Sequence, residues 1–270
     1  MDAIIQHASR VRGSLTVPPD KAICHRAVLV ASIAQGRTQL SPWPSADDCQ
    51  RTLQLVRELG VCVTESGQAV QIEGRGLSAL GAPSRELFCG ESGTTLRLAA
   101  GLLAGQPFRS TLTAGPALCR RPMRRIVDPL ERMGARLEGA GAKGSTEVFP
   151  PITVTGIRPL RAIRYPMDVA SAQVKSAILL AGLFAQGRTT VVERLATRDH
   201  TERMLRHFGA PVERDGAAVS LQPRPLRSPG GLRLPGDVSS AAFLSSRPRA
   251  RRMRKSSCRG SASIRHAPDG

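Results

Sequence analysis

Three glycines at nearly equal spacing place the strongest limit on how this chain folds. Gly60, Gly134 and Gly209 lie 74 and 75 residues apart, and each ends a helical pattern just before strand-like segments. The order of signals upstream of each glycine is also the same. The spacing predicts three copies of a strand–helix–strand–helix–strand–strand unit, each of about 75 residues. Because one copy alone has too little apolar surface, we expect the three to share one core.

The first helix of each predicted unit begins in a polar segment. These segments are 18–26, 89–97 and 168–175, and they lead into helices over 27–34, 98–103 and 176–185. Each carries a cation, of which Lys21, Arg97 and Lys175 are examples. Free amides and the helix dipole at a helix start favour anions, and Gly93 allows a ligand to approach the backbone closely. If the units share a core, the three starts face one common mouth, which is a candidate anion site.

The second helix of each unit carries an apolar stripe and ends at one of the three glycines. We expect these helices over 49–59, 123–133 and 201–208. A hairpin of strands at 61–64 and 69–72 follows the first of them, and a strand at 217–221 follows the last. The predicted fold class is therefore α/β.

Cysteine and histidine usage argues against a metal or disulfide framework. The six cysteines have no Cys-x-x-Cys spacing and the five histidines have no metal-ligand spacing. We expect free thiols, no metal and no cofactor. No segment approaches the roughly 20 apolar residues of a membrane span, and the N-terminus has no apolar signal region. These patterns predict a cytoplasmic protein without a membrane partner.

The net charge of +18 raises the question of a nucleic-acid partner. Residues 245–270 hold much of that charge, with seven Arg, Lys255 and Asp269. Residues 236–244 begin a fourth polar helix start, but no apolar period follows them. We therefore expect 245–270 to be a disordered basic tail. One hypothesis is that the reading frame is lost near Leu244, and the other is a functional basic tail.

A joint set of motifs resembles one known family, 5-enolpyruvylshikimate-3-phosphate (EPSP) synthase. In family order, the matching motifs are Asp20-Lys21 with His25-Arg26, Ser92-Gly93-Thr94-Thr95 with Arg97, Arg121-Pro122-Met123, Ser171-Ala172-Gln173 with Lys175, Arg198-Asp199-His200-Thr201-Glu202, and Gly236-Asp237 with Ser239-Ser240. The resemblance covers residues 1 to about 244.

The resemblance implies two inside-out α/β domains, each of three βαβαββ units. On that basis residues 17–235 form one three-unit domain, and 1–16 supply N-terminal strand or strands of the other. Residues 236–244 begin the second domain, most of which the chain is expected to lack. The chain is therefore interpreted as C-terminally truncated.

The family transfers the enolpyruvyl group of phosphoenolpyruvate to the 5-hydroxyl of shikimate 3-phosphate in aromatic amino acid biosynthesis. By resemblance, the shikimate 3-phosphate residues are Lys21, Arg26, Ser171, Ala172, Gln173 and Arg198. The phosphoenolpyruvate residues are Lys21, Gly93, Arg121 and Gln173. The proton-transfer carboxylates of the family are expected in the missing domain, so no catalytic residue is assigned here. We expect His25 and His200 to be structural or solvated, and Arg97 to be either a surface cation or a ligand contact.

The chain also departs from the usual family pattern. Pro19, Ala22 and Cys24 stand where the family has Gly, Ser and Ser. Glu91 replaces an Asn, which puts an anion beside an anion site at a cost of about 1–4 kcal/mol. Together with the missing domain, these changes predict weak activity or none.

Other functions stay open at this point. One is a non-catalytic protein that binds shikimate 3-phosphate, and another is a basic protein that binds nucleic acid through the Arg-rich tail. A third is the related enolpyruvyl transferase that acts on UDP-N-acetylglucosamine, although Arg198-Asp199-His200-Thr201 favours the shikimate branch. We favour two small-molecule substrates, a monomer and no nucleic-acid partner.

Overall fold

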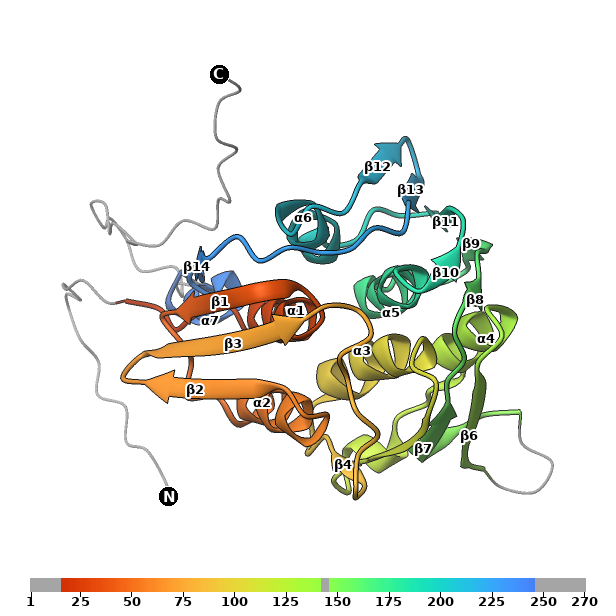
Figure 1. The fold of residues 1–270 in the computed structure, drawn as a ribbon, viewed down its shortest axis with the longest axis horizontal. Helices are drawn as coiled ribbons and strands as arrows, with labels where there is room; N and C mark the ends of the chain where they lie inside the picture. Colours follow the sequence, from red (N-terminus) through yellow and green to blue (C-terminus); the bar gives the residue numbers. More distant parts are fainter. Residues whose placement is uncertain (1–15, 142–145, 246–270) are drawn as a thin grey trace, which may run out of the picture.

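The same strand order recurs in three sheets around a core of helices (Figure 1). The structure is a computed structural model that describes residues 16–141 and 146–245. The strands expected before residue 16 and the tail expected after residue 245 lie outside the described residues.

The second unit shows the complete pattern within one stretch of chain. Its elements are β4 (Leu87–Phe88), α3 (Gly93–Ala104), β5 (Arg109–Thr113), a 3-10 helix η1 (Leu118–Arg120), α4 (Arg124–Arg132), β6 (Arg136–Ala140) and β7 (Phe149–Thr155). The sheet order is β4-β5-β7-β6. β4 is parallel to β5, and the other two pairings are antiparallel.

The third unit repeats this order. Its elements are β9 (Arg164–Met167), α5 (Ala172–Gly182), β11 (Thr189–Glu193), α6 (His200–His207), β12 (Val212–Asp215) and β13 (Ala218–Leu221). They form the sheet β9-β11-β13-β12, again with one parallel pair at the edge. Two short strands, β8 (Leu160–Arg161) and β10 (Ala185–Gln186), pair with each other between the second and third units.

The first unit takes its edge strand from the far end of the described chain. Its elements are α1 (Lys21–Ser32), β1 (Gln35–Ser41), α2 (Asp47–Glu58), β2 (Cys62–Ser66) and β3 (Ala69–Arg75). β14 (Gly231–Arg233) lies parallel to β1 and completes the sheet β14-β1-β3-β2. A helix α7 (Val238–Ser245) follows it. The sequence pattern did not predict β14.

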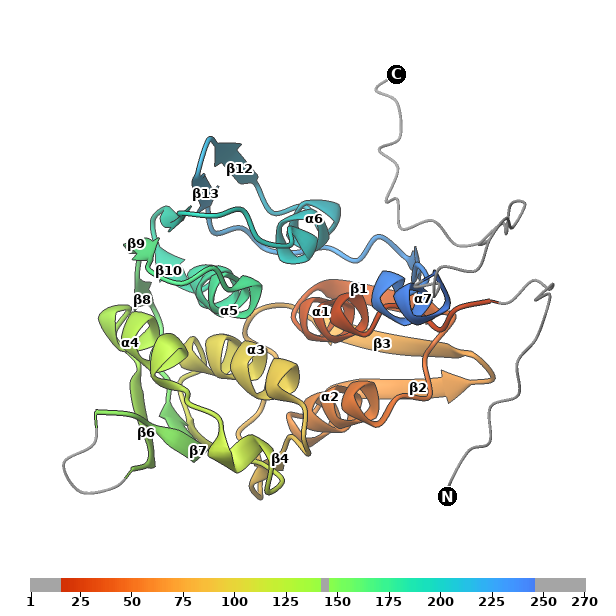
Figure 2. The ribbon, with the colours of Figure 1, turned by 180° about the vertical axis from the view of Figure 1, so that it is seen from behind.

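The first helices α1, α3 and α5 form the centre of the molecule, and the sheets cover them from outside (Figures 1 and 2). Almost every residue of these helices is buried, in keeping with their nearly continuous apolar sequences. α3 and α5 cross closely at Gly101, where an added Cβ would lie 2.3 Å from the carbonyl oxygen of Ala177. This arrangement confirms the predicted inside-out α/β domain.

The second helices α2, α4 and α6 bury only one face, as their amphipathic sequences predict. Their bounds shift by one or two residues from the predicted ones. Gly60, Gly134 and Gly209 have φ values of 87°, 106° and 89°, a region that glycine adopts without steric cost. The predicted helix stops are therefore confirmed. Among the described residues, every helix is too short or too polar to cross a lipid bilayer.

Candidate functional site

Each of the three central helices begins with a side-chain cap. Asp20 accepts a hydrogen bond from the amide of Ile23 at 3.0 Å, and Ser92 accepts one from Thr95 at 3.2 Å. Ser171 does the same for Val174 at 3.4 Å. Each cap satisfies one of the free amides of a first turn and leaves others available. All three helix starts therefore have the local structure of an anion site.

Side chains also join the starts of α3 and α5. Gln173 accepts a hydrogen bond from Arg97 Nη1 at 2.8 Å and donates one to Thr94 Oγ1 at 3.0 Å. Arg97 is therefore no plain surface cation, since it lies half-buried between the two helices. Burial lowers its pKa, and the nearby charges of Arg121 and Arg125 lower it further. An anion bound beside these guanidinium groups would relieve that repulsion.

Gly93 lies directly beneath this cluster of cations. A Cβ at Gly93 would lie 2.8 Å from Arg97 Nη1 and 3.7 Å from Arg121 Nη1. The missing side chain leaves room for both guanidinium groups over the first turn of α3. Gly93, Arg97, Arg121 and Gln173 thus form a small polar site, which we call the Gly93 cluster.

A chain of buried hydroxyls joins α1, α2 and α3 behind the Gly93 cluster. His25 Nδ1 lies 2.6 Å from Thr52 Oγ1, which lies 2.7 Å from Thr95 Oγ1. Thr95 Oγ1 in turn donates to Ser92 Oγ at 2.7 Å. Burial lowers the pKa of His25 to about 4, so the ring is neutral at pH 7. His25 is therefore structural, and the hydroxyl chain fixes the relative positions of the helix starts.

Lys21 lies at the start of α1 with half of its side chain exposed. Its Nζ contacts Asp48 Oδ2 at 2.9 Å. That hydrogen bond raises the pKa of Lys21, and Asp237 adds a smaller effect of the same sign. Because the pair is exposed, it adds little stability, and the ammonium stays accessible to a ligand.

Arg26, one turn further along α1, is almost completely buried at 3% exposure. It donates to the carbonyl of Ala22 at 2.7 Å, to Thr201 Oγ1 at 2.7 Å and to Ser176 Oγ at 2.9 Å. Burial lowers its pKa to about 10. Arg26 therefore links α1, α5 and α6 in this structure.

The remaining predicted residues lie at the same end of the domain. Ser171, Ala172 and Gln173 form the cap and first turn of α5 and are partly accessible. Arg198 is exposed in the loop before α6, and its charge lowers the pKa of both Arg26 and His200, although burial is the larger cause in each case. The starts of the three central helices, which carry most of the predicted residues, thus lie at one end of the domain, joined by the side-chain contacts described above.

Comparisons with known proteins agree with this geometry. Residues 5–246 match the family model described as EPSP synthase (3-phosphoshikimate 1-carboxyvinyltransferase). This chain belongs to the EPSP synthase family.

Two curated relatives and a solved structure show the extent of the match. The 3-phosphoshikimate 1-carboxyvinyltransferase of Streptococcus uberis is 49% identical over 238 residues, which are 88% of this chain and 55% of the relative. The one from Nitrosococcus oceani is 47% identical over 244 residues, or 90% and 54%. EPSP synthase from Acinetobacter baumannii superposes with a TM-score of 0.80 at 44% identity, covering 86% of this chain and 52% of that one. The chain spans about half the length of the curated relatives it matches.

Lys175 does not serve the anion site, although it resembles the other cations of the helix starts in sequence. Its side chain is fully buried, and Nζ lies 3.0 Å from Glu193 Oε1 and 2.6 Å from Glu202 Oε1. Glu193 also contacts Arg214 Nη1 at 3.0 Å. The sequence places Lys175 among the cations of the helix starts, but its position on α5 turns it toward α6 and β11.

The place of Glu91 in the motif predicts that it repels anions, but the structure gives its carboxylate hydrogen-bond partners. Its carboxylate accepts hydrogen bonds from the amides of Ala117 at 3.2 Å and Leu118 at 2.7 Å. Such charge-assisted bonds compensate much of a carboxylate's charge locally. The Glu91 carboxylate, which the sequence predicts to have no partner, therefore caps the start of η1.

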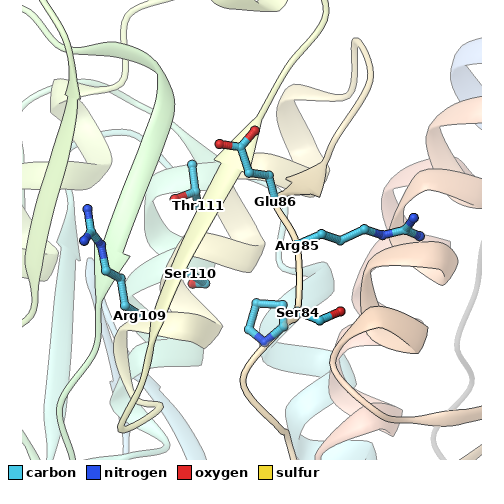
Figure 3. A pocket seen from close by; sticks show the side chains of 7 residues that line it. Ser84, Arg85, Glu86, Arg109, Ser110 and Thr111 are labelled. Atoms are coloured by element: carbon cyan, nitrogen blue, oxygen red, sulfur yellow. The ribbon is translucent and has the colours of Figure 1, made fainter.

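A surface hollow of about 260 Å³ lies between β5 and the segment before β4. Figure 3 shows that the side chains of Arg85 and Arg109 point in opposite directions there. Arg85 instead contacts Glu58 at 2.6 Å. Since α3 begins after the other end of β4, this hollow lies away from the Gly93 cluster, and its charged groups do not converge on a ligand.

Proposed function

We propose that this chain binds shikimate 3-phosphate and phosphoenolpyruvate and takes part in transfer of the enolpyruvyl group to the 5-hydroxyl of shikimate 3-phosphate. The observation that carries the proposal is the Gly93 cluster, in which two guanidinium groups and an amide lie over a glycine at a helix start. Both substrates are phosphorylated carboxylates, and this arrangement of cations and free amides suits them.

The roles of individual residues follow the placement of the three units. Phosphoenolpyruvate contacts Gly93 and Arg121, and Lys21 and Gln173 lie between the two substrates. Shikimate 3-phosphate contacts the start of α5 at Ser171, Ala172 and Gln173, together with Arg198. Arg26 contacts it once its guanidinium leaves the buried hydrogen bonds described above.

We assign no proton-transfer group among the described residues. The reaction forms a bond between the 5-hydroxyl oxygen and the enolpyruvyl carbon and releases phosphate, so the hydroxyl proton needs an acceptor. In our proposal the described residues bind and orient the two substrates, and the carboxylates that move protons belong to a second domain.

We also propose the domain limits expected from the sequence, with 17–235 as one three-unit domain and 236–244 as the start of the second. In support, the described chain enters and leaves the three-unit domain at one place. Residues 18–20 lie beside 235–237, where Asp20 N donates to Pro235 O and Asp237 N donates to Pro18 O, both at 2.8 Å. We also propose a monomer in the cytoplasm, and the free thiols of the described residues support the reducing location.

The test is a thermal-shift titration of the chain with shikimate 3-phosphate, with inorganic phosphate as the reference anion. At about 100 times its dissociation constant, a ligand adds about 2.7 kcal/mol, or roughly 5–11 °C for a domain of this size. Lys21→Ala should abolish the shift. Arg57→Ala, which removes an exposed cation from a pair with Glu65, should leave it unchanged. A shift no larger than that of phosphate would refute the proposal.

A further inference from the structure

Two segments of the second unit run side by side from their sheet to the Gly93 cluster. Cys89 N donates to Thr113 O at 2.9 Å, and Gly115 N donates to Gly90 O at 2.8 Å. Glu91 then holds the amides of residues 117 and 118. Two backbone hydrogen bonds thus join the two segments first, and the Glu91 carboxylate makes the next contact between them.

The end of the second segment carries Arg121. The η1 turn (Leu118–Arg120) begins at the amides that Glu91 holds, and Arg121 N donates to Leu118 O at 3.0 Å. The side chain of Leu118 lies 3.4 Å from the Cβ position of Gly93, next to that of Arg121. The orientation of η1 therefore sets where the Arg121 guanidinium lies over the first turn of α3.

The loop is shaped to bring the carboxylate close. An added Cβ at Gly115 would lie 2.3 Å from Glu91 Oε1, so a side chain at this position would displace the carboxylate. The glycine at this position therefore leaves the space that the Glu91 carboxylate occupies.

We propose that Glu91 is a positioning residue, which orients η1 and thereby holds Arg121 over Gly93 for an anionic substrate. The ligand named here, phosphoenolpyruvate, rests on the proposed function, whereas the contact between Glu91 and η1 does not. The acidic residue in the motif then contributes to anion binding through the loop it caps.

The test compares Glu91→Ala with Glu91→Gln and with a matched control, Glu65→Ala. Glu65 lies in the β2–β3 hairpin and contacts Arg57 at 2.7 Å. Glu91→Ala should weaken phosphoenolpyruvate binding, measured by calorimetry with shikimate 3-phosphate present, by roughly tenfold. Glu91→Gln, which keeps one acceptor oxygen, should recover part of that loss. Glu65→Ala should bind like the parent.

A second measurement needs no ligand. In arginine-labelled protein, the Nε–Hε nuclear magnetic resonance signal of Arg121 should change position in Glu91→Ala and stay unchanged in Glu65→Ala. An unmoved signal, or an unchanged affinity for phosphoenolpyruvate, would overturn the inference. If the parent chain binds no phosphoenolpyruvate, the proposed function fails, and the Arg121 signal alone then decides whether Glu91 positions that side chain.

Discussion

Replacing Lys175 with methionine should destabilise the domain strongly. The change keeps the volume of the side chain but removes the cation that lies between Glu193 and Glu202. Arg214 still compensates Glu193, so Glu202 loses its ion-pair partner and keeps only the more distant charge of Arg26. Breaking a buried pair in this way costs about 3–5 kcal/mol. The free energy of unfolding of a domain of this kind is about 5–15 kcal/mol, so Lys175→Met should lose a large part of its stability.

Urea unfolding of the parent and the variant gives the difference directly. The double variant Lys175→Met with Glu202→Leu provides the internal control, because it removes both members of a pair and leaves Glu193 with Arg214. It should be more stable than the single variant. A loss below about 1 kcal/mol for Lys175→Met, or a double variant no better than the single one, would refute the reasoning.

The pH dependence of stability should be weaker in Lys175→Met than in the parent. Glu193 has a lowered pKa: desolvation opposes the shift, but hydrogen bonds from Thr197 and Lys175 outweigh it. The contribution of Glu193 to the stability of the parent is therefore present above its unfolded pKa. It is lost as the pH falls through the lower pKa of the folded state. Lys175 supplies part of that contribution, so the contribution is smaller in Lys175→Met. The deficit of the variant should therefore shrink as the pH falls below about 4.3, the ordinary pKa of a glutamate.

Two further predictions concern stability. Gly101→Ala puts a methyl group 2.3 Å from the carbonyl of Ala177 at the closest approach of α3 and α5, so urea unfolding should show a loss of about 1–3 kcal/mol; parent-like stability would contradict the packing described. His25 has its pKa lowered by burial to about 4, so the unfolded chain binds its proton first as the pH falls. As the pH falls from 6.5 to 4, the free energy of unfolding should decrease by about 3 kcal/mol. Urea unfolding at several pH values should show a weaker dependence on pH for His25→Gln; an equal dependence in the variant would contradict the prediction.

Local signals in the sequence predicted much of the fold. The glycines at 60, 134 and 209 sit at positions of positive φ, and Ser92 and Ser171 cap helices as their types predict. These features depend on residues close in sequence, so a pattern reveals them. The three central helix starts could be expected at one end of the domain because each unit contributes the same helix start.

Features that depend on distant partners were missed. Three residues of β14 show no period of their own, and their partner β1 lies about 190 residues earlier, so only the closed arrangement of units defines the strand. The direction of Lys175 depends on which face of α5 meets α6. The partners of Glu91 depend on the shape of a loop 26 residues away. A pattern of neighbouring residues does not predict such contacts between distant segments.

The pairing of β14 with β1 has a consequence for the order in which the domain is made. A ribosome releases the chain from its N-terminus, so the second and third units have all four of their strands as soon as they are synthesised. The first sheet instead lacks its parallel edge until residues 231–233 appear. The unit that is synthesised first is therefore the last to be completed, and until then the free edge of β1 is open to pairing with another chain.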